Sequence, residues 1–404
     1  MSDAPLTVVG IGADGWPGLG EAARAAVLEA RLLVGSARQL ALVPPTPAVR
    51  RAWPSPIDDL LDDLASGRAG AACVLASGDP MLHGIGATLA RRVDPARLTV
   101  HPSPSAFSLA CARLRWAAAE TTLVSAVAEP VASIGWALQP GRRLVVYVPG
   151  TAGAAAVAAL LREHGLGPSR LVVLDELGGP GERIEESTAD GWGDRPAGAL
   201  HAVAVECRPA PGTVPLSRVP GLPDGAFESD GQLTREEVRA ITLAALQPMP
   251  GELLWDIGAG SGAIGIEWLR AEPTARAIAV EARPDRATRA ERNALALGVP
   301  RLHVVVGHAP AALGQLEQPD AIFIGGGLTA PGLPERCWEA LRPGGRIVAN
   351  AVTLEGERRL HAAHADHGGR LVRLEVSRAE PIGGYTGWRP YLPIVRWSSR
   401  KDLA

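Results

Sequence analysis

Short apolar runs alternate with alanine-rich amphipathic runs along most of this chain, a pattern that predicts α/β architecture. In the first half, strands are expected at residues 6–9, 71–76, 98–101, 144–148, 171–175 and 201–207, and helices at 19–30, 88–92 and 152–164. Between Arg208 and Ala226 the periodicity stops and proline and glycine dominate, as is typical of a linker. We therefore predict a first domain at residues 1–207, a linker at 208–226 and a second domain at 227–404.

The second half starts with Thr234 as a helix N-cap, with Glu237 as its capping-box partner, and a helix running to about Leu246. Strands are expected at 253–257, 277–281, 302–306, 321–324 and 346–349, with helices at 263–270 and 286–297. Two further runs, 371–376 and 391–397, are separated by a glycine-rich loop at 383–387. They predict an antiparallel pair at the sheet edge.

Composition narrows the function classes. The chain has 404 residues, too many for one ordinary core, and 40 basic residues nearly balance 43 acidic ones, which argues against binding to nucleic acid or a membrane surface. Lys401 is the only lysine, so arginine would have to bind any anionic ligand. Four cysteines without CxxC spacing predict neither a disulfide framework nor a metal site. We see no signal peptide or membrane-spanning run and expect a cytoplasmic protein.

A glycine-rich loop after the strand at 253–257 is the strongest local signal. Asp256 ends the strand and three alternating glycines follow, which allow a sharp turn and close approach to a ligand. The next helix presents its N-terminal N–H groups to a carboxylate or phosphate. Glu281, about twenty residues further on, can accept hydrogen bonds from ribose hydroxyls. The segment therefore predicts a nucleoside-binding site.

Two cofactors fit such a loop. Residues 260–265 also satisfy GxGxxG, which would indicate a nicotinamide-dependent reductase. Asp256 before the first glycine, together with the terminal antiparallel pair, favours S-adenosylmethionine instead. We keep the reductase as the less favoured alternative.

Four motifs in order, at residues 232–239, 256–262, 307–310 and 320–327, make the second half resemble the CbiT family of cobalamin biosynthesis. That resemblance implies methylation of carbon 15 of a precorrin and decarboxylation of the acetate on carbon 12. It also implies that S-adenosylmethionine is surrounded by Thr234, Asp256, Gly258, Ala259, Gly260, Ser261, Gly262, Glu281 and Ala309. The family commonly has Thr-Lys where this chain has Thr234-Arg235, so the positive charge is kept.

Three loops in the first half, at residues 8–16, 76–80 and 101–105, together resemble the CbiE branch of the tetrapyrrole methylase superfamily, which methylates precorrin carbon 5. The resemblance implies S-adenosylmethionine bound between two small α/β lobes, contacting Gly10, Gly12, Gly78, Asp79, Pro80, Ser103 and Ser105. Two features depart from the family: residues 12–15 read Gly-Ala-Asp-Gly in place of Gly-Pro-Gly, and no His-Gly motif lies near Ser125. A non-catalytic tetrapyrrole-binding scaffold is therefore a second hypothesis for this half.

The resulting fold prediction is α/β throughout: a two-lobed tetrapyrrole-methylase fold followed by a Rossmann-like S-adenosylmethionine methyltransferase fold. Methyl transfer to an already nucleophilic carbon needs alignment more than a strong base, so no catalytic residue is assigned. Substrate carboxylates would be held by arginines, for which Arg283, Arg389 and Arg396 are candidates, although each is more often a fold or surface residue. Trp388 is expected to pack rather than stack on a macrocycle. The partners expected are a small-molecule tetrapyrrole substrate and, by resemblance, further copies of this chain.

Overall fold

A computed structural model describes residues 4–403, which form two compact units. One unit comprises the described residues up to Val131 together with Pro140–Thr213, and the other comprises Ala132–Gln139 and the residues from Val214 onward. Over the described residues, no helix is long and apolar enough to cross a membrane. The domain limits predicted from the sequence stay a prediction.

The first lobe of the first unit is a parallel sheet in the order β3-β2-β4-β1-β5. Its strands are β1 (Leu6–Ile11), β2 (Leu32–Gly35), β3 (Val49–Ala52), β4 (Ala72–Ser77) and β5 (Leu98–His101), and its helices are α1 (Glu21–Glu29), α2 (Ala37–Ala41), α3 (Asp58–Ser66) and α4 (Ile85–Ala90). The apolar side chains of β1 alternate between two cores: Val8 packs with leucines of α3, and Val9 packs with Val27 of α1. Helices therefore cover both faces, as a parallel sheet requires.

The second lobe is a mixed sheet in the order β6-β7-β10-β8-β9, in which only β6 and β7 run parallel. Its elements are α5 (Ala106–Leu114), β6 (Thr121–Ser125), β7 (Arg143–Tyr147), α6 (Gly153–Glu163), β8 (Arg170–Asp175), β9 (Arg183–Thr188), α7 (Ala189–Trp192) and β10 (His201–Glu206). The α/β prediction for this half is confirmed.

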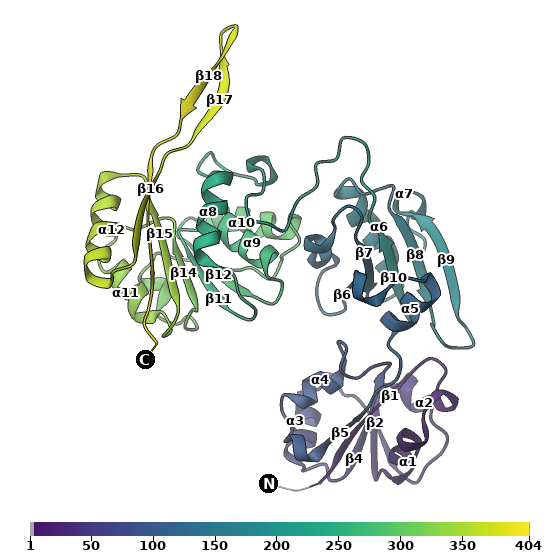
Figure 1. The fold of residues 1–404 in the computed structure, drawn as a ribbon. Coiled ribbons are helices and arrows are strands. Elements are labelled where there is room, and N and C mark those ends of the chain that lie inside the picture. Colours follow the sequence, from purple (N-terminus) through teal and green to yellow (C-terminus); the bar gives the residue numbers. More distant parts are fainter. Residues whose placement is uncertain (1–3, 404) are drawn as a thin grey trace. The chain divides into compact units, whose positions relative to one another are not determined.

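The second unit has a sheet in the order β13-β12-β11-β14-β15-β19-β16. Its elements are α8 (Glu236–Leu246), β11 (Leu253–Ile257), α9 (Ala263–Ala271), β12 (Arg276–Glu281), α10 (Pro284–Ala296), β13 (His303–Val306), β14 (Ala321–Ile324), α11 (Leu333–Ala340), β15 (Arg346–Ala351), α12 (Leu354–His367), β16 (Arg370–Leu374), β17 (Ser377–Ile382), β18 (Tyr385–Pro390) and β19 (Ile394–Arg400). The helices α8 and α9 cover one face of the sheet, and α11 and α12 cover the other (Figure 1). Leucines of α8 and α9 pack in the core on the first face, and Cys337 of α11 and Leu360 of α12 pack in the core on the second. The first five strands in this order are parallel, and β19 and β16 complete the sheet as the predicted antiparallel pair.

Between β16 and β19 the chain forms a separate two-stranded hairpin, β17 and β18, which extends away from the sheet of its own unit (Figure 1). The predicted loop at 383–387 therefore belongs to this hairpin: the turn takes only the first two glycines, and β18 begins at Tyr385. Trp388 is 75% exposed on β18, so the prediction that it packs is wrong.

The predicted capping box at Thr234 is also wrong. The helix α8 begins at Glu236, and its N-cap is Arg235, whose side chain makes no capping hydrogen bond. Glu237 instead forms an ion pair with Arg378 of β17, with Arg378 Nη2 2.9 Å from Glu237 Oε2. Glu237 therefore pairs with a residue far along the chain, Arg378, and does not cap the helix.

Residues predicted to be a structureless linker contribute to the second core. Leu222 is buried in the same cluster as Leu243 and Leu246 of α8, and Leu216 packs against that cluster. The short segment Ala132–Gln139 also belongs to this unit, where the guanidinium of Arg218 lies 4.8 Å from the ring centre of Trp136. The sequence pattern offers no signal for either attachment.

Candidate cofactor and substrate sites

A cavity of about 580 Å³ lies in the first unit, lined by residues of both lobes. Of the residues predicted for this site, Gly12, Gly78, Asp79 and Ser105 line the cavity. They lie at the carboxyl ends of β1, β4 and β5, where open α/β sheets bind ligands. Each of the three loops is a weak sequence signal by itself, and the fold brings all three to a single site.

Gly10, Pro80 and Ser103, the other residues predicted for this site, do not line the cavity but lie close to one another and to Gly78, which does. Ser103 Oγ donates a hydrogen bond of 2.8 Å to Gly10 O. A Cβ placed on Gly10 would lie 2.0 Å from Gly78 O, 2.8 Å from Ser103 N and 3.1 Å from Pro80 Cδ. Gly10 is therefore the point at which all three loops touch, and only glycine fits there.

Sequence reasoning missed several polar residues of this cavity, all supplied by elements far apart in the chain. Arg38 of α2 lines it and donates from Nη2 to Ser77 Oγ at 3.3 Å. Tyr147, at the end of β7, accepts a hydrogen bond from Phe107 N at 2.9 Å, and burial raises the pKa of its phenol. No local motif marks either residue, because Arg38 and Tyr147 belong to different lobes and meet only in the lining of the folded cavity.

His201 is a further missed residue that lines the cavity. Its Nδ1 lies 2.8 Å from Gly198 O, which can only accept, so Nδ1 carries a proton. Nε2 is buried and has no hydrogen-bond partner among the described residues. In the neutral ring this nitrogen is an acceptor, available to a donor on a bound ligand.

In the second unit, the predicted glycine loop joins β11 to α9. Gly258, Gly260 and Gly262 all have positive φ, at 70°, 58° and 78°, so the loop geometry requires residues without a Cβ. A Cβ on Gly258 would lie 2.6 Å from Gly326 Cα, which places the glycine run after β14 directly against the loop.

The carboxylate of Glu281 holds this loop in place. Oε2 accepts a hydrogen bond of 2.8 Å from Gly260 N, and Oε1 accepts one of 3.0 Å from Arg283 N. Each oxygen keeps a second lone pair, so the carboxylate can still accept from ribose hydroxyls. Glu281 both shapes the loop and remains able to bind a nucleoside.

Asp256 is buried behind the loop, where its Oδ2 accepts a hydrogen bond of 2.9 Å from Gly265 N in the first turn of α9. Burial, reinforced by the negative charge of Glu281, raises the pKa of Asp256 to about 7 and outweighs that hydrogen bond. Asp256 therefore fixes the loop against the helix from within.

The raised pKa of Asp256 predicts a particular pH dependence of stability. Between the ordinary carboxyl pKa and about 7, the folded protein binds more protons than the unfolded chain, so this group lowers the free energy of unfolding as pH rises. Asp256→Asn removes this pH dependence. The free energy of unfolding of the variant minus that of the native protein should therefore rise by about 1–3 kcal/mol from pH 5 to pH 8. Denaturant unfolding across this range measures it, with the exposed Asp366→Asn as the control. A constant difference would contradict the assignment.

The segment before α8 is clamped onto the glycine loop. Asn293 of α10 donates from Nδ2 to Ser261 O at 2.9 Å and to Glu228 O at 3.0 Å. Arg286 donates from Nε to Asp230 Oδ2 at 2.8 Å and from Nη2 to Gln232 Oε1 at 2.7 Å. The chain thus reaches Thr234 already fixed beside the loop.

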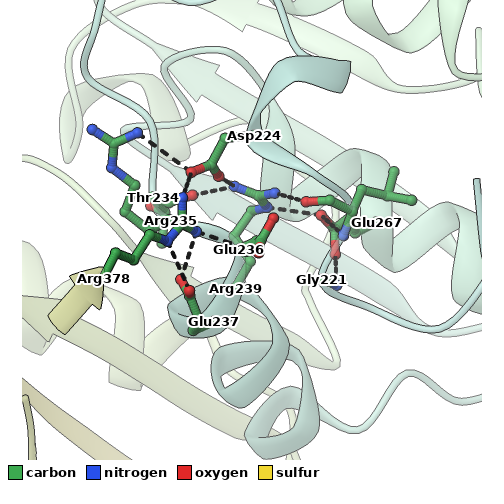
Figure 2. Close-up of polar contacts among 10 residues, drawn as sticks. Gly221, Asp224, Thr234, Arg235, Glu236, Glu237, Arg239, Glu267 and Arg378 are labelled. Carbon is green, nitrogen blue, oxygen red and sulfur yellow. Dashed lines mark hydrogen bonds and ion pairs between the residues drawn. The ribbon is translucent and has the colours of Figure 1, made fainter. Parts of the chain in front are cut away.

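A buried charge network then positions Thr234 itself (Figure 2). Arg239 of α8 is fully buried and donates to the Thr234 carbonyl, to Glu267 Oε1 at 2.7 Å and to Asp224 Oδ1 at 2.8 Å. Although burial of Asp224 acts in the opposite direction, its hydrogen bond to Arg239 holds the pKa of this carboxyl below its ordinary value. Sequence reasoning missed the network, whose members come from the expected linker, two helices and the hairpin.

The last predicted residue of this site, Ala309, follows β13 by a short turn in which Gly307 N donates to the backbone carbonyl of Glu281 at 2.9 Å. The arginines proposed for substrate carboxylates have other partners: Arg283 pairs with Asp285, and Arg389 with Glu380. Arg396 donates from Nη1 to Ile241 O at 2.9 Å. None of these contacts gives the three arginines a role at the glycine loop.

Comparison with known proteins gives matches to both halves. The family of tetrapyrrole (corrin/porphyrin) methylases matches residues 5–191, and the precorrin methyltransferase domain matches residues 225–401. A precorrin-6Y C(5,15)-methyltransferase [decarboxylating] from Sinorhizobium sp is 47% identical over 397 residues, covering 98% of this chain and 96% of that protein. One of the same name from Mycobacterium tuberculosis (strain CDC 1551 / Oshkosh) is 43% identical, covering 98% of this chain and 100% of the relative.

A crystal structure of the C-terminal domain of precorrin-6Y C5,15-methyltransferase from Rhodobacter capsulatus is 50% identical to the matching part of this chain. The match covers 46% of this chain and 100% of that domain, with a TM-score of 0.44.

The two domain matches define a methyltransferase in which a tetrapyrrole methylase domain precedes a precorrin methyltransferase domain. The nearly full-length similarity goes further: the chain belongs to the family of precorrin-6Y C(5,15)-methyltransferases (decarboxylating). Membership of this family removes the reductase alternative.

Proposed function

We propose that this chain methylates carbons 5 and 15 of precorrin-6B (6Y) and removes the carbon-12 acetate carboxyl as carbon dioxide, giving precorrin-8. The observation that carries the proposal is the match, 47% identical over 397 residues and covering 98% of this chain, to a relative whose name describes both methylations and the decarboxylation. We assign carbon 5 to the half at residues 1–207, and carbon 15 with the decarboxylation to residues 227–404.

S-adenosylmethionine is the methyl donor in this proposal, and both candidate sites fit it. In the second unit, the loop around Gly260 allows close approach to a ligand, and Glu281 can accept from ribose. In the first unit, the cavity beside Gly12 and Gly78 is large enough for a small molecule. When bound, S-adenosylmethionine supplies an electrophilic methyl group on sulfur.

Each methylation forms a carbon–carbon bond to the macrocycle and breaks the carbon–sulfur bond, with S-adenosylhomocysteine leaving. The macrocycle carbon supplies the electron pair, so the chain must bind, orient and exclude water rather than provide a strong base. In the decarboxylation, the bond to the carboxyl carbon breaks and its electron pair enters the protonated macrocycle. Arg38, Tyr147 and His201 are the polar groups we assign to tetrapyrrole binding in the first unit.

The direct test incubates the full-length protein with precorrin-6B and isotopically labelled S-adenosylmethionine and follows the product by mass spectrometry. The expected product has gained two methyl groups and lost one carbon dioxide. A product with one methyl group would contradict the assignment of two active sites, and retention of the carboxyl would contradict the decarboxylation.

Gly10→Ala is expected to abolish the methylation of carbon 5 and to spare that of carbon 15. The added Cβ cannot fit 2.0 Å from Gly78 O, so the loops must separate and the cavity wall is lost. The measurement is the number of labelled methyl groups in the product, which should fall from two to one. Gly20→Ala is the matched control, because a Cβ at Gly20 meets nothing within 4 Å.

The same variant tests the alternative in which the first unit only binds the tetrapyrrole, which is motivated by the departure from Gly-Pro-Gly at residues 12–15. A scaffold predicts that the native protein adds a single methyl group and that Gly10→Ala changes substrate affinity alone. Two methyl groups from the native protein, and one from the variant, exclude it.

A further inference from the structure

A second cavity, of about 460 Å³, lies in the second unit far along the sheet from the glycine loop. It is formed by the start of β15, the end of β19, the start of β16 and the last turns of α8. Arg346, which lines it, begins β15 and pairs in register with Arg400 of β19. The cavity is thus at the amino ends of the parallel strands, whereas Gly258 and Glu281 are at their carboxyl ends.

Arginines dominate the polar lining of this groove. Arg346, Arg370, Arg396 and Arg400 all line it, together with Ser398 and Ser399, and within the described residues no aspartate or glutamate does. Arg396, Ser398 and Arg400 alternate along β19, and Arg370 is the register partner of Ser398. The alternation places these side chains on one face of the two strands, opposite Trp397 and Leu371, which pack on the α12 side.

Two of these arginines are occupied by the fold. Arg346 binds both Glu252 and the carbonyls that end α8, and Arg400 donates from Nη1 to Gly344 O at 2.8 Å and from Nη2 to Gln247 Oε1 at 3.2 Å. Arg370 and Arg396 keep unused donors. Arg396 Nε is buried without a hydrogen-bond partner, and Arg370 has no ion pair or side-chain hydrogen bond within the described residues.

The positive charges of Arg370 and Arg396 also repel each other. Burial, and then the positive charge of Arg370, lower the pKa of Arg396. Like charges held together without a counterion destabilise a fold, and an anion between them removes that cost. The apolar side chains of α8 in the lining, Ile241, Ala244 and Ala245, can contact the carbon body of such a ligand.

We propose that this groove is a binding site for a small organic polyanion, a compound whose apolar body carries at least two carboxylates. Arg370 and Arg396 bind one carboxylate, and the N–H groups of Arg400 that Gly344 and Gln247 leave unused bind another together with Ser398. The aliphatic side chains of α8 contact the body. The site does not depend on the methyl-transfer function proposed above, and it is separate from both candidate methyl-donor sites.

The test uses 1,3,5-benzenetricarboxylate as the probe and isothermal titration calorimetry on the full-length protein at low ionic strength. We expect saturable binding that weakens as salt is added. Arg370→Gln should weaken it about tenfold or more, the scale of one charge-assisted hydrogen-bonding contact. The exposed position of Arg370 makes this change harmless to folding, which circular dichroism checks.

Arg373→Gln is the matched control, because it removes the same charge from the same strand but outside the groove lining. Benzoate tests the need for several carboxylates, and inorganic pyrophosphate tests the need for a carbon body. Equal losses in Arg370→Gln and Arg373→Gln, benzoate binding as tightly as the probe, pyrophosphate binding more tightly, or no saturable binding would each overturn the proposal. Both variants are also titrated with S-adenosylmethionine, which they should bind as the native protein does. This measurement separates a failure of the groove proposal from a failure of the methyltransferase assignment.

Discussion

Replacing Glu281 by glutamine is expected to weaken S-adenosylmethionine binding to the second unit by ten- to a hundredfold, the effect of losing charge-assisted hydrogen bonds. In the native protein both carboxylate oxygens accept backbone N–H groups, from Gly260 and Arg283. The glutamine amide offers only one acceptor atom, so one of these N–H groups faces an NH₂ group. The loop then loses its anchor at the point where it must contact the nucleoside, and the ribose loses a charged acceptor.

The measurement is a calorimetric titration with S-adenosylmethionine, together with the methyl count in the product. The glutamine variant should lose the carbon-15 methyl group while retaining the carbon-5 methyl group. Glu291→Gln, an exposed glutamate of α10, provides the control and should bind normally. If Glu281→Gln bound the methyl donor as the native protein does, the loop would not be the cofactor site of this unit.

The fold of the second unit was predictable because its signals are local. A buried strand that contains Asp256 and is followed by alternating glycines appears within ten residues, and the edge pair β16 and β19 shows as two apolar runs. Hydrophobic periodicity marks such elements wherever one face is buried. The hairpin of β17 and β18 was missed because it has no buried face to produce such periodicity. Its apolar side chains, such as Tyr385 and Trp388, are exposed.

The site residues also divide into those with a local signal, which were predicted, and those without one, which were missed. Glycines were found because the features that require them belong to a short loop: close contacts at Gly10 and a positive φ at Gly258. Tyr147 and His201 were not found, because they reach the first cavity only through the pairing of β7 with β10. The capping box at Thr234 failed because Glu237 has a stronger partner in Arg378, which is 141 residues away.

Replacing Arg239 by methionine is expected to destabilise the second unit by about 3–5 kcal/mol, the usual cost of leaving one partner of a buried ion pair uncompensated. Arg239 and Glu267 are both almost completely buried, and among residues 4–403 Glu267 otherwise accepts only from Gly221 N at 2.6 Å and Leu222 N at 3.2 Å. The guanidinium also donates to the carbonyl of Thr234 (Figure 2) and to that of Leu222. Methionine fills the space but leaves a buried carboxylate and two carbonyls without partners.

Hydrogen exchange of peptides from α8 and α9, measured against denaturant, isolates the second unit from the first. Arg235→Gln is the matched control: it removes a neighbouring arginine from the same carboxylate, Asp224, at 3.3 Å, but from an exposed position. Exposed pairs contribute at most about 1 kcal/mol, so this change should be small. Adding Glu267→Gln to Arg239→Met should recover part of the loss, because the unpaired charge is then removed.

The network also connects stability with function, since Arg239 holds the carbonyl of Thr234 and Asp224 is shared with Arg378 at the base of the hairpin. Arg239→Met should therefore weaken S-adenosylmethionine binding even at temperatures where the unit remains folded, and Arg235→Gln should not. Recovery of stability in the double variant without recovery of binding would show that the arginine positions the cofactor segment directly. Equal effects of Arg239→Met and Arg235→Gln on both measurements would show that the buried pair has no special role.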